Sequence, residues 1–328
     1  SRILGRDIRG KSMKIIFTTL IYCLFANLSF SQSAELYDKN NTEMVDDYLW
    51  AVSVDKQGNK WLGTGDYGLI KFDGSEFTNL NEENSEIKGI FVSPIFTDSK
   101  GNVWLNFSKP NHRIAKFDGK NWEVFKENDL PTSQINVISI IEDIDGNVYF
   151  GGANGVLIFD GKKWKSLDFP SKGIIIRTMD IDEKGNFAIG HNSGLILRKN
   201  GVWKKLTKDN SDLQLSVVRA VKFVNDKLLV GYGGGMGNGG LSIIENDKWT
   251  HFNKTNSKIP DHMVRDIEID NNGTIWMATN NGMIKMVNDK IEPIYFREGM
   301  YKNTVLDIET EGSIIWVATN FGLIKITQ

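Results

Sequence analysis

Short runs of alternating side chains, separated by glycine-rich turns, occupy most of this chain. In one typical run, Lys60, Leu62 and Thr64 alternate with Trp61 and Gly63, as expected for the two faces of an extended strand. β-Branched and aromatic residues dominate these runs, which is the composition of strands. No long stretch of the repeated region has the 3.6-residue period of a helix. The pattern therefore predicts an all-β chain.

One sequence unit recurs seven times between about Asp55 and Gln328. Its clearest copy reads Asp-x-x-Gly-Asn-x-Trp-Leu-Gly-Thr over residues 55–64, followed after a short loop by Gly-Leu-Ile-Lys-Phe-Asp-Gly over residues 68–74. The spacing of 39 to 47 residues between copies is typical of propeller blades. We therefore expect a seven-bladed β-propeller of four-stranded antiparallel blades over residues 32–328. The later copies fill the place of Trp61 with Trp104, Tyr149, Ala188, Leu229, Trp276 and Trp316.

The seventh copy ends at Gln328 before a fourth strand. At the other end of the chain, residues 34–39 followed by Asn-Asn-Thr align with residues 249–254 followed by Thr-Asn-Ser. We expect this N-terminal strand to pair beside residues 322–327 and to complete the last blade. Such a closure removes an open sheet edge that would otherwise invite aggregation.

Residues 1–31 are expected to lie outside the propeller. A basic start at Met13-Lys14 precedes an apolar run over residues 15–30, and Ser29 and Ser31 occupy the small-residue positions of a cleavage site. This pattern predicts a secretory signal peptide over residues 13–31, with a retained N-terminal anchor as the alternative. We interpret residues 1–12 as upstream of the true start or as an expression remnant. The prediction is an exported protein, periplasmic or extracellular, without stable membrane insertion after signal cleavage.

The cysteine count and the net charge of the chain limit its redox chemistry and its binding partners. The single cysteine, Cys23, lies in the signal region, so the mature chain needs no disulfide. Residues 1–31 carry five basic side chains and one acidic, which leaves 34 basic and 40 acidic side chains and a net charge of −6. A mildly acidic chain binds nucleic acid poorly, so we expect no nucleic-acid partner.

The most regular residues of the repeat indicate structure rather than chemistry. Asp-x-x-Gly-Asn predicts a tight turn, and the tryptophans predict packing between blades. The copy at residues 143–147 is similar to a calcium loop but lacks the acidic residue that closes one. The four histidines have no metal-ligand spacing, and no serine or cysteine lies in a nucleophile elbow. We therefore expect no metal, no cofactor and no catalytic residue.

The repeat resembles that of the two-component regulator propeller family over nearly all of residues 45–328. The likeness is strongest at residues 61–64, 276–279 and 316–319. In that family such propellers form extracytoplasmic sensors of hybrid histidine kinases, often as two rings, and many are associated with sensing polysaccharide fragments. This sequence has one ring and no kinase or DNA-binding region. The resemblance therefore implies the fold and a recognition role, not signalling by this chain itself.

Two loops depart from the repeat on the rim where specificity is usually placed. The loop of copy two, residues 106–113, is two residues longer than usual and has Arg113 in place of a glycine, and that of copy five, residues 231–240, is four residues longer. Drift of surface loops is the alternative explanation. The candidate ligand-binding residues on this rim are Lys109, His112, Arg113, His191, Met236 and Asn238.

A second group of candidates lies on the innermost strands. Arg177, Arg219 and Arg265 occupy equivalent places in three consecutive copies. Three guanidinium groups in one sector favour a carboxylate or sulfate on a ligand; the alternative is that each pairs with a blade carboxylate such as Asp266. The remaining copies have Trp50, Ser93, Ile138 and Leu306 at this place, and Trp50 joins the candidate site.

The leading hypothesis is an exported, non-catalytic ligand-binding or sensing propeller that recognises a glycan or another anionic small ligand on the loop rim. The first alternative is a protein-interaction scaffold whose partner is an envelope protein. The second is a propeller lyase or hydrolase that uses His112 or His191 with a metal.

Overall fold

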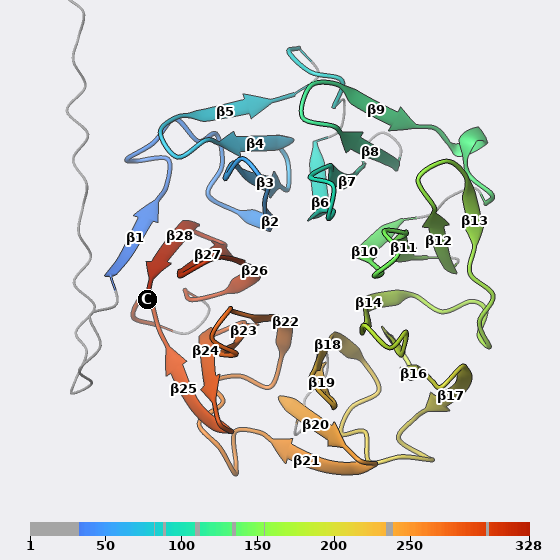
Figure 1. Cartoon of the computed structure of the whole chain (residues 1–328). Helices are drawn as coiled ribbons and strands as arrows, with labels where there is room; N and C mark the ends of the chain where they lie inside the picture. The colour runs from blue at the N-terminus through green and yellow to red at the C-terminus, as the bar shows by residue number, and fades with distance from the viewer. Residues whose placement is uncertain are drawn as a thin grey trace, which may run out of the picture.

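The computed structural model describes residues 33–81, 83–87, 90–108, 112–132, 136–153, 155–233, 239–299 and 302–328. In this part of the chain, seven four-stranded antiparallel sheets stand around a central axis (Figure 1). The predicted seven-bladed propeller is confirmed. The signal peptide expected over residues 13–31 and the residues before it lie outside the described residues.

Each blade runs from an innermost strand beside the axis to an outermost strand at the circumference (Figure 1). Blade 1 comprises β2 (Leu49–Val54), β3 (Lys60–Thr64), β4 (Leu69–Phe72) and β5 (Phe77–Leu80). Blade 2 comprises β6 (Phe91–Thr97), β7 (Val103–Ser108), β8 (Arg113–Phe117) and β9 (Trp122–Phe125). The short 3₁₀ helix η1 (Glu127–Asp129) follows, and blade 3 comprises β10 (Val137–Glu142), β11 (Val148–Gly152), β12 (Gly155–Phe159) and β13 (Trp164–Ser166).

The remaining blades repeat this order. Blade 4 comprises β14 (Ile176–Ile181), β15 (Phe187–His191), β16 (Gly194–Lys199) and β17 (Val202–Leu206). Blade 5 comprises β18 (Val218–Val224), β19 (Lys227–Tyr232), β20 (Leu241–Glu245) and β21 (Lys248–Phe252). Blade 6 comprises β22 (Val264–Ile269), β23 (Ile275–Thr279), β24 (Gly282–Val287) and β25 (Lys290–Ile294). Blade 7 comprises β26 (Val305–Glu311), β27 (Ile314–Thr319), β28 (Gly322–Thr327) and, from the other end of the chain, β1 (Ser33–Tyr37).

In blades 1, 2 and 6 the repeated aspartate and tryptophan act together in the hairpin between the first two strands. Asp55 Oδ1 accepts the backbone N–H groups of Gln57 and Asn59, which forms the turn, and its Oδ2 accepts the indole N–H of Trp61 at 2.9 Å. The indole itself is 1% exposed and packs against the neighbouring blade. The predicted turn and the predicted packing are therefore joined by one hydrogen bond. The same pairing occurs at Asp98–Trp104, Asp270–Trp276 and, with a phenol, Asp143–Tyr149.

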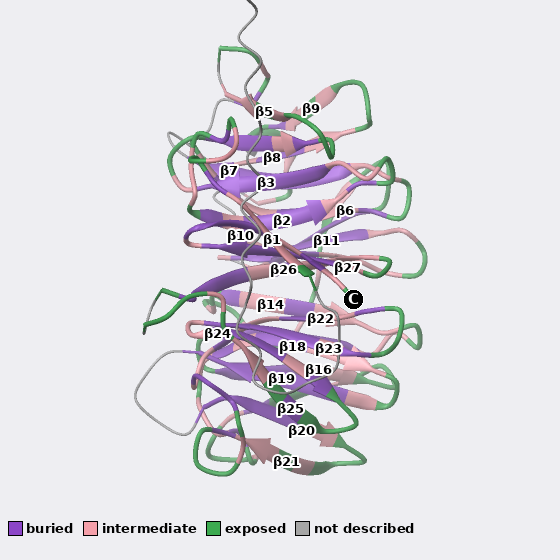
Figure 2. Ribbon diagram, turned by 90° about the vertical axis from the view of Figure 1, so that its left-hand side faces the viewer, coloured by how far each residue is buried: buried purple, intermediate pink, exposed green. Residues whose placement is uncertain are grey.

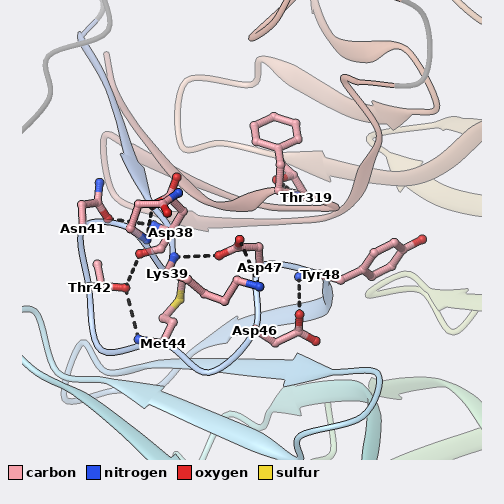
Figure 3. Close-up of polar contacts among 11 residues, drawn as sticks. Asp38, Lys39, Asn41, Thr42, Met44, Asp46, Asp47, Tyr48 and Thr319 are labelled. Atoms are coloured by element: carbon pink, nitrogen blue, oxygen red, sulfur yellow. Dashed lines mark hydrogen bonds and ion pairs between the residues drawn. The ribbon is translucent and has the colours of Figure 1, made fainter.

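The N-terminal strand closes the ring as the sequence predicts. β1 pairs antiparallel with β28, with Ala34 opposite Ile326 and Leu36 opposite Ile324. In the turn that follows (Figure 3), the Asp38 N–H donates to Asn41 Oδ1 at 2.8 Å. Asn253 and Asn256 after β21 make the same bond at 2.8 Å. The aligned polar residues thus build the same turn after β1 and after β21.

Buried residues run through the blades, and exposed residues gather in the loops of the two rims (Figure 2). The apolar core is divided into clusters that lie between neighbouring blades. Within the described residues, no helix is long and apolar enough to cross a bilayer. The scaffold leaves its loops and its central channel available for function.

Candidate ligand site at the channel mouth

A β-bulge at the start of every innermost strand shapes the mouth of the channel. At this point the pairing register of the innermost strand with its neighbour shifts in all seven blades. A bulge leaves a residue unpaired and re-aims its side chain. Each bulged residue lines the central cavity: Trp50, Ser93 with Pro94, Ile138, Arg177, Arg219, Arg265 and Leu306. The equivalence that the sequence indicates for these positions thus has a structural cause.

The cavity follows the propeller axis and has a volume of about 640 Å³. Its mouth opens on the rim of the loops between second and third strands. Arg265 Nε donates to Asn280 Oδ1 at 2.8 Å, and Asn280 lies in the β23–β24 loop. In the same way, a Cβ atom added to Gly233, just after β19, would lie 2.7 Å from Arg219 Cδ. The arginines therefore lie on the rim that the sequence indicates.

The three arginines form a sector of uncompensated positive charge in blades 4 to 6. Burial lowers the pKa of Arg219 to about 10, and the guanidinium groups of Arg265 and Arg177 lower it as well. Burial also lowers the pKa of Arg265, against weaker opposing effects of Tyr48 and Asp261. Among the described residues no carboxylate forms an ion pair with any of the three, and Arg177 Nε is buried without a hydrogen-bond partner.

The carboxylate suggested as an alternative partner is engaged elsewhere. Asp266 Oδ2 accepts the backbone N–H of Ile308 at 3.0 Å, and Asp307 Oδ2 accepts that of Val52 at 2.8 Å. These bonds link blade 6 to blade 7 and blade 7 to blade 1. The acidic side chains below the mouth therefore hold neighbouring blades together rather than neutralise the arginines.

An acidic layer lies deeper in the channel, which sequence reasoning missed. Its carboxyl groups are those of Asp180, Asp266, Glu268, Asp307 and Glu309, and it contains one lysine, Lys222, whose Nζ lies 2.9 and 3.0 Å from the Glu268 carboxylate oxygens. Alignment of the innermost strands would have revealed it, because Asp180, Lys222, Glu268 and Glu309 pair with the residues at the repeated tryptophan position.

Desolvation raises the pKa of four carboxyl groups in the acidic layer. It raises the pKa of Asp180 and of Asp266 to about 6, and that of Glu309 to about 8. The pKa of Asp307 is raised well above its ordinary value by desolvation and by the adjacent Asp266. Lys222 acts in the opposite direction on Asp180. These four carboxyl groups thus retain protons at a pH where isolated carboxyl groups have lost them.

The two histidine candidates do not join this site. His191 is 6% exposed at the end of β15, and its Nδ1 accepts the Ser193 N–H at 3.1 Å. Burial lowers its pKa, so the ring is a neutral acceptor in a turn. His112 is exposed in the β7–β8 connection. Among the described residues, no group of three or more potential ligands is arranged to hold a metal.

The long loop of copy two is partly strand. Phe107 pairs with Arg113 across β7 and β8, and Phe107 is 4% exposed in the core. The hairpin therefore extends one pair further than in blade 1, and Arg113 occupies the glycine position without a left-handed backbone. Arg113 and His112 are not among the described residues that line the cavity. Lys109, Met236 and Asn238 lie outside the described residues.

Comparison with known proteins agrees with this architecture. Residues 258–281, in blade 6, match the family model described as two component regulator propeller. No curated protein matches the chain.

Solved structures with similar folds include virginiamycin B lyase from Staphylococcus aureus, at 15% identity and a TM-score of 0.72, covering 90% of this chain and 99% of that one. The extracellular domain of a Bacteroides protein assigned as hybrid two component system BT3049 of B. thetaiotaomicron matches at 20% identity and a TM-score of 0.68. That alignment covers 86% of this chain and 40% of that one. PorZ, a surface component of the type-IX secretion system of Porphyromonas gingivalis, matches at 14% identity and a TM-score of 0.63, over 86% of this chain and 47% of that one.

At these identities the likeness to solved structures establishes the fold alone. The extracellular domains of regulators share it with a lyase, so the fold by itself does not select a function. The family model adds a sequence match for one segment, residues 258–281. This chain is a single seven-bladed propeller, and residues 258–281 within it match the two component regulator propeller model.

Proposed function

We propose that this chain is an exported, non-catalytic ligand-binding or sensing propeller that holds an anionic group of its ligand at the channel mouth. The observation that carries the proposal is the sector formed by Arg177, Arg219 and Arg265, which no described carboxylate neutralises. An entering carboxylate or sulfate would accept charge-assisted hydrogen bonds and would relieve the repulsion among the guanidinium groups.

The dimensions of the site support a small ligand. A cavity of about 640 Å³ falls within the range of roughly 300–1,000 Å³ that is usual for small-molecule sites. A short acidic oligosaccharide or another small organic anion would place its charged group at the mouth. Similar structures that are extracellular domains of regulators support a periplasmic or extracellular sensing role.

Isothermal titration calorimetry with acidic oligosaccharides and small organic anions tests this function. The wild-type chain is compared with Arg177→Gln and Arg219→Gln, and Lys248→Gln on the outermost strand β21 serves as a matched loss of charge. We expect each arginine variant to bind about ten-fold more weakly or worse, because a hydrogen bond to a charged group contributes roughly 1.5–3 kcal/mol. The control should bind as the wild type does. Absence of binding by every anion, or equal affinity across the variants, would contradict the proposal.

A further inference from the structure

The channel mouth has two chemically different halves. Blades 4 to 6 contribute the three arginines, whereas Leu306, Trp50, Pro94 and Ile138 contribute mainly apolar surface from blades 7, 1, 2 and 3. An opening with a cationic half and an apolar half favours a ligand that has an anionic side and an apolar side. The arginine half would bind the anionic group of the ligand. The apolar half would bind a different part of the same ligand.

Three aromatic rings form a continuous wall on the apolar half. The Tyr48 and Trp50 ring centroids lie 5.2 Å apart, and those of Trp50 and Phe91 lie 5.5 Å apart. Tyr48 is 38% exposed, and both Trp50 and Phe91 line the cavity while remaining partly exposed. We call Tyr48, Trp50 and Phe91 the aromatic wall.

Trp50 differs from every other tryptophan of the chain. Four occupy the second strands and are at most 2% exposed, at Trp61, Trp104, Trp276 and Trp316. Four occupy the outermost strands, at Trp122, Trp164, Trp203 and Trp249, and pack against the core clusters. Trp50 is the ninth, and the bulge in β2 turns it into the channel instead of between blades. Packing between blades explains the positions of the other eight tryptophans but not that of Trp50, which is therefore available to contact a ligand.

The loop before β2 holds Tyr48 at the edge of the wall. The Lys39 N–H donates to Asp47 Oδ1 at 2.7 Å, and the Tyr48 N–H donates to Asp46 Oδ1 at 3.1 Å. Figure 3 shows these contacts, with the Tyr48 ring directed away from them. Tyr48 also lies near enough to Arg265 to affect its pKa, so the aromatic wall and the arginines border one opening.

The acidic layer limits how deep negative charge can enter. A second anionic group carried further along the channel would approach Asp266 just below the mouth, whose pKa of about 6 leaves it ionised at neutral pH, and then the Glu268 carboxylate, which Lys222 already pairs. Repulsion between like charges is strong away from bulk water. The channel therefore accommodates one anionic group at the mouth and disfavours a multiply charged anion.

We propose that the ligand is a six-membered ring that carries one carboxylate, with the carboxylate on the arginines and a ring face against the aromatic wall. This inference rests on the proposed function and specifies the ligand class of the same site. An aromatic acid presents a planar ring, and a uronic acid presents the apolar C–H face of a sugar; either face can lie flat against an indole.

Ligand-observed NMR titrations with four probes test the inference. Glucuronate and benzoate are ring monocarboxylates from the two sources, acetate is a carboxylate without a ring, and citrate carries several carboxylates. We expect at least one ring monocarboxylate to bind ten-fold or more tightly than acetate, and citrate to bind no more tightly than acetate. Whether glucuronate or benzoate binds more tightly identifies the source of the ring.

Variants separate this inference from the function on which it rests. Trp50→Ala should reduce the affinity for the ring monocarboxylate ten-fold or more and leave that for acetate unchanged, whereas Trp50→Phe, which keeps a ring, should retain most of the affinity. Thermal melts confirm that both variants are folded. Unchanged affinity of Trp50→Ala for the ring monocarboxylate would overturn the inference, as would tighter binding of citrate than of every ring probe. If Arg219→Gln still weakens acetate binding, the proposed function stands in either case. If no probe binds the wild type, the proposed function fails with it.

Discussion

Arg219 lies between two other guanidinium groups in a partly buried position. Burial and the charges of Arg265 and Arg177 lower its pKa to about 10, and no described carboxylate pairs with it. Arg198 is a contrasting case, because its guanidinium lies over the rings of Phe187 and Trp203 and donates to the Gly185 carbonyl. Arg219 is therefore repelled by its charged neighbours, whereas Arg198 makes favourable contacts.

The contrast predicts opposite effects on stability. Arg219→Gln should raise the free energy of unfolding by about 1 kcal/mol in the absence of ligand, because it removes a repulsive charge at a site kept for binding. Arg198→Gln should lower it by about 1 kcal/mol, because a partly desolvated cation–π contact and a hydrogen bond are lost. Urea denaturation of the three proteins measures both changes. Destabilisation by Arg219→Gln would assign that arginine a structural role instead.

At the scale of the hairpin, the chain contains a natural comparison between two turns. Asp98 and Asp182 each accept two backbone N–H groups and one asparagine side chain. Asp98 also accepts the indole N–H of Trp104 at 2.8 Å, whereas Ala188 stands at the equivalent place in blade 4. The two aspartates differ in this one bond.

Alanine at these positions should therefore have unequal costs. Asp98→Ala should destabilise the fold by about 1–3 kcal/mol more than Asp182→Ala, because it leaves a buried indole N–H without an acceptor. Denaturant titrations of the two variants give the difference directly. Equal losses would show that the turn alone, and not the bond to the indole, accounts for the repeated aspartate.

The closing strand is the second element with a measurable role. β1 completes blade 7, Leu36 packs against the core cluster of that blade, and the Tyr37 ring packs in a tilted arrangement against Phe72 and Phe77 of blade 1. Deletion of residues 32–40 should cost at least about 3 kcal/mol, from the apolar area that these side chains bury. Thermal melting should show a sharp decrease, and a peptide of residues 33–41 added in excess should restore part of it. An unchanged melting temperature would refute the closure.

Across the whole molecule, the innermost strands are joined around the channel by side chains. Phe223 N–H donates to Asp180 Oδ2 at 2.6 Å between blades 5 and 4, and Asp266 and Asp307 make the corresponding links from blade 6 to blade 1. These carboxyl groups therefore couple ring closure to protonation. Their raised pKa values mean that the folded chain binds more protons than the unfolded chain between the ordinary carboxyl pKa of about 4 and the folded values.

Stability should consequently fall as the pH rises. The contribution of these groups is complete below about pH 4 and is lost as the pH rises through about 6 for Asp180 and Asp266 and about 8 for Glu309. The lowered pKa values of buried His191, of half-buried His251 and of His112 act in the opposite direction below about pH 6.5. Between pH 6.5 and 8.5 we expect the free energy of unfolding to decrease by about 2 kcal/mol, mostly from Glu309.

Glu309→Gln isolates this effect. Denaturant titrations at the two pH values should show a smaller decrease in the variant, because glutamine cannot lose a proton in this range. Glu292→Gln on the outer strand β25 should behave as the wild type does. A pH dependence that is the same in all three proteins would show that the channel carboxyl groups do not cause it.

Local residue patterns predicted most of the fold but only part of the site. The repeat gave the blades because its turns and its inter-blade packing recur every 39 to 47 residues. Arg177, Arg219 and Arg265 could be aligned because they share one place in that repeat. The hydrogen bond between Asp98 and Trp104, by contrast, depends on how the hairpin twists. The sequence predicted a turn at the aspartate and packing at the tryptophan, but not the bond between them.

Spacing and alternation along the chain were sufficient to predict the all-β architecture, the seven blades and the strand that closes them. Only the tertiary structure shows which side chains face one another across the channel. Trp50 opposite Arg219, and Asp307 beside Val52, are brought together by ring closure from distant parts of the chain. No local pattern encodes such a pair, because the seven bulges that aim these side chains share a backbone geometry but not a residue type.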